Sequence, residues 1–279
     1  MKVRGERECQ ECGSRWSYYE TGSVACPDCG SLQSVGVDDR TAHTDAQTSL
    51  DLSSHRGGFG EARGTLPADG VDDLKSDLRE YARRRGFIRG GELLPLDATY
   101  LAARELLEAV DCYDRLRDPT DAEREYLLDL LAGADDGDRP ATERVPDRLR
   151  EARGMAAVRA VDEYRSDLLA FLDELADWTD QGPGVDAPDT DAVDAPNADA
   201  PTVSVDGDRN AVGSRIAPAR GVLERLRDRT KRVEALGGDV AAADADALVD
   251  AANALSEYVK TGDPTALDRA RSKLPDDPA

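Results

Sequence analysis

Lysine, histidine and aromatic residues are scarce in this sequence. Only five of its 36 basic residues are lysine, and 13 of its 279 residues are aromatic. Its two histidines, His43 and His55, precede every segment with a helical pattern, which excludes a bundle holding a di-iron centre through Glu-x-x-His pairs. No stretch approaches the roughly 18 apolar residues of a membrane-spanning helix, so we expect no membrane contact.

Motifs of common enzyme classes are lacking as well. The chain contains no Gly-x4-Gly-Lys-Ser/Thr phosphate loop, no Gly-x-Ser-x-Gly nucleophile turn and no His-Glu-x-x-His motif. The residues ahead of the first cysteine lack the apolar run of a secretory signal. We therefore expect a soluble, non-enzymatic protein in the cytoplasm.

Four of the five cysteines form two Cys-x2-Cys pairs separated by 13 residues, and a glycine follows each pair. Glycine can take the left-handed conformation that aims backbone N–H groups at the sulfurs. The pattern predicts one closed tetrahedral site for one Zn²⁺, whose binding supplies on the order of 10 kcal/mol toward folding. The expected ligands are Cys9, Cys12, Cys26 and Cys29.

Other roles for these residues are less well matched to the sequence. Two disulfides would require an oxidising compartment, which the missing secretory signal argues against. The fifth cysteine, Cys112, lies in a helical pattern, and we expect it to be a small core residue. We expect His43 and His55 to be solvated loop residues, because four thiolates already fill a tetrahedral site.

The charge of the chain is strongly acidic. Its 58 acidic and 36 basic residues leave a net charge of −22, with 40 aspartates against 18 glutamates and 31 arginines against five lysines. Repulsion among these carboxylates is screened in molar salt, where the Debye length is about 3 Å, so the composition indicates a halophilic protein. GC-rich codon usage is the alternative explanation.

The order of patterns along the chain predicts a mainly α fold with a small β zinc ribbon at its start. A helical bundle with a long coiled-coil-like helix follows, and then a helical hairpin. The expected boundaries are a zinc ribbon over 1–36, a flexible tether over 37–70, the bundle over 71–180, an acidic disordered linker over 181–214 and the hairpin over 215–275.

The long helix is expected from about Pro146 to Trp178. Apolar residues recur there at threes and fours, which suits antiparallel packing within the chain or self-association as a coiled coil. Gly154 is the point at which we expect this helix to loosen or break. The residues of the apolar seam are Val161, Tyr164, Leu168, Phe171, Leu175 and Trp178.

Two segments reverse the acidic bias. Residues 79–89 hold five arginines, and residues 209–232 hold eight basic residues. A solvated face that balances neighbouring carboxylates is the first expectation, and nucleic-acid contact is the alternative. The arginines considered for nucleic-acid contact are Arg83, Arg84, Arg85, Arg225, Arg229 and Arg232.

The two knuckles, Cys9-x2-Cys12-Gly and Cys26-Pro-x-Cys29-Gly, resemble the zinc ribbon of transcription factor IIB type. About 45 residues at the start of the chain also resemble uncharacterised haloarchaeal proteins that carry this ribbon. The resemblance implies zinc held by the four cysteines and a module that docks on RNA polymerase. That family continues into paired cyclin-like repeats, which are not visible in this sequence, so a general initiation role is not expected.

The same two knuckles also resemble those that hold the iron in rubredoxin-type centres. That resemblance implies a lone iron ion that carries electrons, and it remains an alternative to zinc.

The expected function is therefore protein docking, with a partner in transcription or RNA handling. We expect the ribbon to present Arg15, Trp16 and Tyr18 to this partner. The ribbon aromatics could instead cover the metal knuckles or stack on bases, the latter as part of a nucleic-acid-binding alternative.

Overall fold

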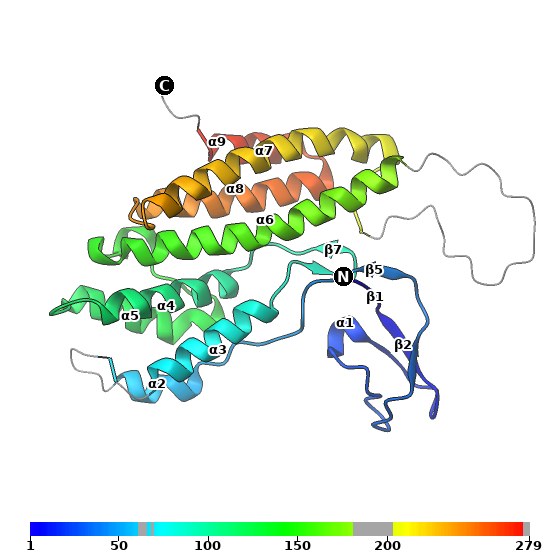
Figure 1. The fold of residues 1–279 in the computed structure, drawn as a ribbon, viewed down its shortest axis with the longest axis horizontal. Helices are drawn as coiled ribbons and strands as arrows, with labels where there is room; N and C mark the ends of the chain where they lie inside the picture. The colour runs from blue at the N-terminus through cyan, green and yellow to red at the C-terminus, as the bar shows by residue number, and fades with distance from the viewer. Residues whose placement is uncertain (61–65, 68–69, 181–202, 276–279) are drawn as a thin grey trace, which may run out of the picture.

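A computed structural model describes residues 1–60, 66–67, 70–180 and 203–275. It confirms the predicted fold class, because a small β region at the start of the chain is followed by a helical bundle (Figure 1). One long helix runs through the middle of the bundle, and the β region lies beside one end of it.

Two small antiparallel sheets form the β region, which we call the ribbon (residues 1–42). Strand β2 (Glu6–Cys9) pairs with β3 (Arg15–Ser17) on one side and with β4 (Ser34–Gly36) on the other. A one-turn helix, α1 (Tyr18–Thr21), follows β3. Strand β1 (Lys2–Arg4) pairs with β5 (Arg40–Ala42), so the ribbon extends beyond the predicted residue 36.

The segment expected as a tether, residues 37–70, has regular structure where it is described. It contains β5 and helix α2 (Ser53–Gly60). Leu52 and Phe59 are buried in the main apolar core. Both bury their side chains against residues of the bundle that are distant in sequence, so the local composition gave no indication of this packing.

The expectation of solvated histidines is wrong. The ring of His43 is buried against the rings of Tyr18 and Tyr19. His55 is also buried, and its Nε2 lies 2.8 Å from a carboxylate oxygen of Asp77. Each histidine thus fixes part of the segment between the ribbon and the bundle.

A short hairpin connects the ribbon to the bundle. Helix α3 (Val71–Arg84) leads into strands β6 (Ile88–Arg89) and β7 (Glu92–Leu93). The N–H of Thr44 donates to the carbonyl of Ile88 at 2.8 Å, and the N–H of Gly91 donates to the carbonyl of Ala42 at 2.8 Å. The end of the ribbon therefore continues into the hairpin through backbone hydrogen bonds.

Helices α4 (Ala98–Asp114) and α5 (Asp121–Gly133) follow. The cap of α5 is Thr120, in a capping box with Glu123. Three 3₁₀ turns then lead to the long helix. They are η1 (Ala134–Asp136), η2 (Thr142–Arg144) and η3 (Asp147–Leu149).

Helix α6 (Arg150–Asp180) is continuous over 31 residues and passes through Gly154 without a break. All the predicted seam residues from Val161 to Leu175 are fully buried, and Trp178 packs partly against the same core. α6 packs against α4 on one side and against α7 (Arg209–Ala235) and α8 (Ala242–Thr261) on the other. The seam is therefore used within the chain, and a second copy could reach it only by opening the bundle.

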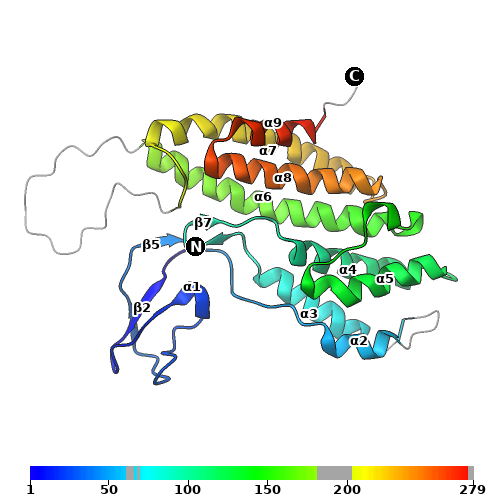
Figure 2. The same cartoon turned by 180° about the vertical axis from the view of Figure 1, so that it is seen from behind.

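The last helices complete the bundle (Figure 2). α7 starts at Arg209, because Asp208 caps it, so this helix occupies part of the predicted linker and hairpin boundary. α9 (Pro264–Ser272) begins after the cap Asp263, with Pro264 in its first turn. Most of the predicted acidic linker, residues 181–202, lies outside the described residues. None of the helices in the described ranges combines the length and apolarity that crossing a bilayer requires.

Candidate metal centre and ribbon surface

The two Cys-x2-Cys segments fold into matching knuckles. The N–H of Gly13 donates to the carbonyl of Cys9 at 3.0 Å, and the N–H of Gly30 donates to the carbonyl of Cys26 at 2.9 Å. Both glycines have positive φ, 76° and 72°, which side chains other than glycine adopt with strain. The glycine after each pair thus gives both knuckles the same turn, as the sequence predicted.

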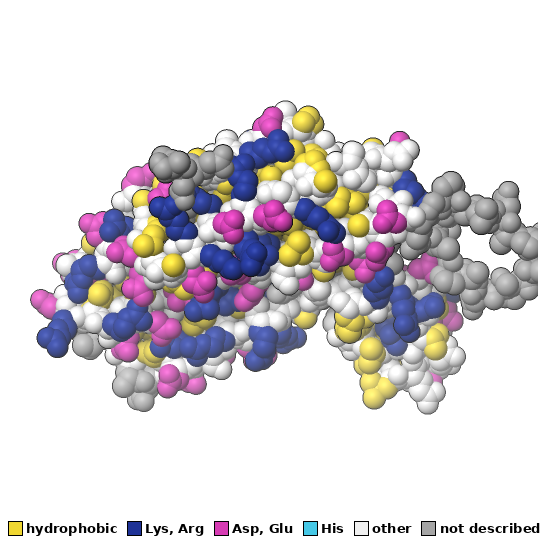
Figure 3. All heavy atoms as spheres, turned by 45° about the horizontal axis from the view of Figure 1, so that its top comes forward, with side chains coloured by type: hydrophobic (Ala, Val, Ile, Leu, Met, Phe, Trp, Pro, Cys, Tyr) yellow, Lys and Arg dark blue, Asp and Glu magenta, His cyan; other side chains and the backbone are white. Residues whose placement is uncertain are grey.

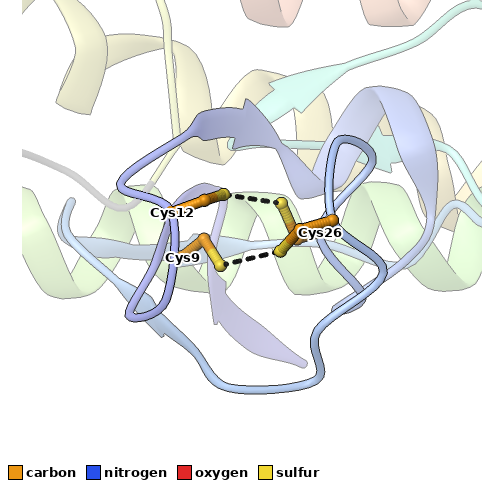
Figure 4. Close-up of side chains that lie close together, drawn as sticks. Cys9, Cys12 and Cys26 are labelled. Atoms are coloured by element: carbon orange, nitrogen blue, oxygen red, sulfur yellow. Dashed lines mark hydrogen bonds between the residues drawn. The ribbon is translucent and has the colours of Figure 1, made fainter.

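The four sulfurs converge on one point between the knuckles. All four lie within 4.8 Å of one another, and the Cys9–Cys29 and Cys12–Cys26 sulfur pairs are 3.6 and 3.5 Å apart (Figure 4). A disulfide requires about 2.05 Å. A zinc tetrahedron with Zn–S bonds of about 2.3 Å has sulfur–sulfur edges of about 3.8 Å, which matches this cluster. The four cysteines can therefore bind one metal ion.

Ionisation of the cluster also favours a bound cation. Hydrogen bonding with Ser14 lowers the pKa of the Cys12 thiol to about 6. The backbone of Ser31 favours the Cys29 thiolate, but the neighbouring sulfurs, Cys12 first, outweigh it and raise the pKa of Cys29 to about 12. Four thiolates this close repel one another, so the cluster ionises fully only around a positive charge.

The ribbon aromatics hold the metal knuckles in place. Trp16 is 7% exposed and forms a small cluster with Cys9 and Cys26, and its Nε1 donates to the carbonyl of Ser23 at 3.0 Å. Of the predicted docking residues, Trp16 is thus buried in the ribbon itself. Arg15 is exposed and pairs with Glu8 at 2.6 Å, and Tyr18 is half-buried. The expected trio does not form one exposed patch.

The ribbon also carries a basic hollow that its sequence did not predict. Lys2, Arg4, Arg7 and Arg40 line a hollow of about 390 Å³, which we call the ribbon hollow. Figure 3 shows lysine and arginine side chains gathered on the ribbon lobe. Local charge counts hid this surface, because the basic and acidic residues of the ribbon alternate along the chain and separate only when the strands pair.

The first arginine cluster is mostly engaged by carboxylates. Arg85 bonds to Asp45 and Asp97, and Arg84 lies 3.5 Å from Glu80. Arg83 instead lines an open hollow. The solvated-face expectation therefore fits Arg84, whereas Arg85 is a half-buried structural residue.

That second hollow, the bundle hollow, lies among α3, α4 and α6 and has a volume of about 520 Å³. Arg79 and Arg83 enter it from α3, and within the described residues neither has a carboxylate at ion-pair distance. Arg104 lines it too and is already bonded to Glu163 and to the hydroxyl of Tyr100. The lining of the bundle hollow thus combines these two arginines with the bonded Arg104–Glu163 pair and with Asp167, which accepts from Thr44 and from the N–H of Phe87.

The three arginines predicted from the second basic segment lie on α7. Arg225 donates to the carbonyl of Leu274 at the end of α9. Arg229 and Arg232 line a hollow of about 300 Å³ beside the α7–α8 turn. They do not lie near Arg83 in sequence or on the same helix, so the six predicted arginines are spread over two faces of the bundle.

Charged residues inside the bundle bind one another. Glu105 is fully buried and accepts hydrogen bonds from Arg139, Arg153 and Tyr126. Arg153 also forms two hydrogen bonds of 2.9 Å to Asp246, which links α4, α6 and α8. Because each group is satisfied inside the core, this network stabilises helix packing.

Comparison with known proteins places the whole chain in one family. Neither the curated proteins nor the solved structures give a significant match to it. The model described as "Family of unknown function (DUF7117)" matches residues 1–185 and 188–274, which together span nearly all of the sequence. The chain is therefore a member of this DUF7117 family.

Proposed function

We propose that this protein is a non-enzymatic adaptor whose zinc ribbon docks on a partner protein. The observation that carries the proposal is the closed four-sulfur cluster, which leaves no ligand position for a substrate and therefore serves to fold the ribbon. The ribbon also exposes several apolar side chains that are available for contact with a partner. The exposed side chains are Val24 at 45%, Leu32 at 73%, Val35 at 44% and Val37 at 44%.

Transcription or RNA handling is the process we propose for the partner. The basis is the resemblance of the two knuckles to the ribbon of transcription factor IIB type, in which the module binds RNA polymerase. In this chain the helical bundle is attached to the ribbon where that family has its cyclin-like repeats. We therefore propose an adaptor that brings the bundle to the machinery rather than a general initiation factor.

Zinc is the proposed metal, and an iron centre for electron transfer is the alternative. The same four-sulfur geometry accommodates either ion, so metal analysis of protein purified without added metal decides between them. One zinc per chain and no visible absorption are expected. If the purified protein contained iron and absorbed visible light, electron transfer would become the leading function in place of docking.

Affinity capture from native lysate tests the docking proposal. Tagged wild-type protein is compared with the Cys9→Ser/Cys12→Ser double variant, with and without nuclease, and Cys112→Ala is the matched control because Cys112 lies outside the cluster. We expect a partner that resists nuclease and is lost only in the double variant. A partner retained by the double variant would contradict ribbon docking.

Nucleic-acid binding is a second candidate function, and the bundle hollow is the observation that favours it. Arg79 and Arg83 offer guanidinium groups without internal carboxylate partners there. Titration with labelled single-stranded RNA at several salt concentrations is the test. Binding that weakens with salt and falls in Arg79→Gln/Arg83→Gln would support this function, and salt-independent or absent binding would exclude it.

A further inference from the structure

The ribbon hollow brings together basic residues from both sheets of the ribbon. Lys2 and Arg4 come from β1, Arg7 from β2 and Arg40 from β5. The other lining residues include Val24 and none that is acidic. In a chain with a net charge of −22, a concave surface lined only by basic and uncharged residues is a local reversal of charge.

Two of these arginines face each other across paired strands. Arg4 and Arg40 are directly opposite in the antiparallel β1–β5 register, so their side chains leave the same face of this sheet. Side chains in such positions have Cβ atoms about 4.5–5.5 Å apart, and like charges there are destabilising. An anion between the two guanidinium groups would turn this repulsion into attraction.

The structure supplies no such anion from within the described residues. Arg4 donates to the carbonyl of Asp38 at 2.6 Å, and Arg7 donates to the hydroxyl and the carbonyl of Ser34, both at 3.0 Å. No carboxylate lies within ion-pair distance of Arg4, Arg7 or Arg40 across the described residues. Because each guanidinium has five N–H donors, donors remain for a ligand.

Lys2 differs from the three arginines, because its ammonium group lies 2.7 Å from Glu174 on α6. This ion pair holds β1 against the bundle. The three arginines are then the positive charges that remain for a ligand at the hollow.

Glycine at position 36 shapes the hollow. A Cβ at Gly36 would lie 2.5 Å from the Cβ of Arg4, so the side chain of Arg4 lies against the bare backbone of β4. The acidic residues of β2 are directed away, because Glu8 pairs with Arg15 on the opposite face of the three-stranded sheet from Arg7. Strand pairing and the alternation of side chains along each strand thus separate the acidic from the basic residues of the ribbon.

The chemistry of the surface favours a carboxylate ligand with apolar neighbours. Arginine binds carboxylates in a bidentate manner, and the exposed Val24 at the hollow offers apolar contact. Single-stranded nucleic acid would use several aromatic rings for stacking. Trp16 is buried and Tyr19 packs on His43 and hydrogen-bonds to Thr41, which leaves the half-buried Tyr18 as the aromatic ring in the lining of the hollow. A protein segment with alternating acidic and apolar side chains fits both features.

We propose that the ribbon hollow binds an acidic segment of the partner protein through Arg4, Arg7 and Arg40. This inference rests on the proposed docking function and names the face and the chemistry of the partner. The carboxylates of the segment lie between the arginines, and its apolar side chains contact Val24 in the lining of the hollow.

The test uses the zinc-loaded full-length protein and a short fluorescein-labelled peptide in which aspartate and valine alternate. The matched peptide has asparagine in place of aspartate. Arg4→Gln/Arg40→Gln removes the facing pair, and Arg117→Gln/Arg227→Gln is the control, because these exposed arginines of the bundle also lack ion pairs within the described chain. Binding is measured by anisotropy at low and at molar salt.

We expect the Arg4→Gln/Arg40→Gln variant to bind the acidic peptide about tenfold more weakly, which corresponds to two modest ion pairs. The control variant and the wild type should bind the acidic peptide alike. The asparagine peptide should bind the wild type no better than the acidic peptide binds the Arg4→Gln/Arg40→Gln variant. The thermal midpoint of this variant should stay within a few degrees of that of the wild type, because relief of the repulsion between the two arginines offsets loss of the hydrogen bond from Arg4 to Asp38. A midpoint lower by about 10 °C or more would assign these arginines to folding and overturn the view that they serve a ligand.

If the control variant bound the peptide as weakly as the Arg4→Gln/Arg40→Gln variant does, the attraction would be general between charges and the site would be overturned. Displacement of the peptide by single-stranded RNA at equal concentration would also overturn the proposal, because it would assign the hollow to nucleic acid. Affinity capture separates this inference from docking itself. A partner lost in Cys9→Ser/Cys12→Ser but kept in Arg4→Gln/Arg40→Gln would leave docking intact and refute this surface, whereas a partner kept in both would refute docking.

Discussion

Asp45 lies in the segment that joins the ribbon to the bundle, and its side chain is 0% exposed. One carboxylate oxygen accepts from Arg85 at 2.5 Å, and the other accepts from Arg89 at 2.9 Å. The N–H of Gly86 also donates to Asp45 at 3.2 Å. Arg85 and Arg89 therefore form ion pairs with a buried aspartate. This explains why the arginine-rich segment 79–89 need not be a binding surface.

Asp45→Asn should lower the free energy of unfolding by about 1–3 kcal/mol, because it removes the buried charge that Arg85 and Arg89 share, although Arg85 keeps its ion pair with Asp97. Glu80→Gln is the control, since the Arg84–Glu80 pair is about half exposed on both sides and is worth at most about 0.5 kcal/mol. Urea titrations followed by circular dichroism measure both. A small effect in Asp45→Asn would mean that Arg85 and Arg89 are solvated.

His43 makes the junction between ribbon and bundle sensitive to acid. Burial lowers the pKa of His43 below its usual value of 6.5, Asp45 opposes this effect, and Arg89 and the amino terminus add to it. The unfolded chain therefore takes up a proton before the folded one does. Stability from His43 is complete above pH 6.5 and is lost as the pH falls below it.

His43→Asn should remove this acid sensitivity while keeping an acceptor near the N–H of Gly90, which donates to Nδ1 of His43 at 3.3 Å. The thermal midpoint of wild type minus that of the variant, measured from pH 7.5 to 5.5, should fall as pH falls. One group contributes a slope of at most about 1.4 kcal/mol per pH unit. A difference that stays constant would show that the pKa of His43 is the same in the folded and unfolded states.

The metal ligands could be predicted from sequence because their spacing is local. Each knuckle is set by a Cys-x2-Cys-Gly segment, and the structure brings the two together. The facing of Arg4 and Arg40 could not be predicted, because it depends on pairing between strands that lie 36 residues apart in sequence. The ion pair between Arg85 and Asp45 could not be predicted either, because these residues are 40 apart in sequence.

At the scale of elements, Gly154 shows why a residue type can mislead. A glycine inside a helix predicts a weak point, but α6 continues through it. A Cβ at this position would lie 2.1 Å from the carbonyl oxygen of Gly238, in the turn between α7 and α8. The glycine is therefore required by the close approach of that turn to α6, which no property of the α6 sequence reveals.

Gly154→Ala should destabilise the bundle, because separating the turn from α6 costs about 1–3 kcal/mol or more, against a helix-propensity gain of about 1 kcal/mol. Gly221→Ala on α7 is the matched control. No atom lies within 4 Å of a Cβ there, so propensity alone acts and the variant should be more stable than the wild type. Thermal unfolding of the two variants should shift in opposite directions, and a shared direction would contradict the contact.

Element boundaries were predictable where the start and stop signals are strong. The Asp263-Pro264 cap and the last periodic residue before Gly262 fix the α8–α9 turn. α2 was missed because its residues are glycine-rich, and its position depends on Arg56, which donates to the carbonyl of Ala132 in α5 at 3.0 Å. Tertiary contacts rather than propensity hold this helix.

At the scale of the whole molecule, the apolar residues fall into two separate clusters. One contains Cys9, Trp16 and Cys26 and lies inside the ribbon. The other runs from Ala42 through the helices to Leu274. The ribbon therefore depends on its cysteine cluster for a core, whereas the bundle has a large apolar core of its own, so the two parts should respond differently to loss of the metal.

Removing the metal with a chelator should unfold the ribbon and leave the helices folded. The fluorescence of Trp16, isolated in a Trp178→Phe background, should shift toward that of a solvated indole, because its cluster with Cys9 and Cys26 is lost. Far-ultraviolet circular dichroism should stay close to that of the metal-bound protein. Acid should have the same effect on the ribbon, since protons compete with the metal for thiolates.

Cys12→Ser should behave like the chelated protein, and Cys112→Ala should keep its metal, because Cys112 is buried in α4 away from the cluster and burial raises its pKa to about 12. The ribbon contacts the bundle through the Lys2–Glu174 ion pair, and Ala42 at the end of β5 packs in the apolar core of the bundle. Loss of the helical signal together with the Trp16 signal would therefore mean that the bundle folds only on a metal-bound ribbon, and the ribbon could not act as an independent docking module.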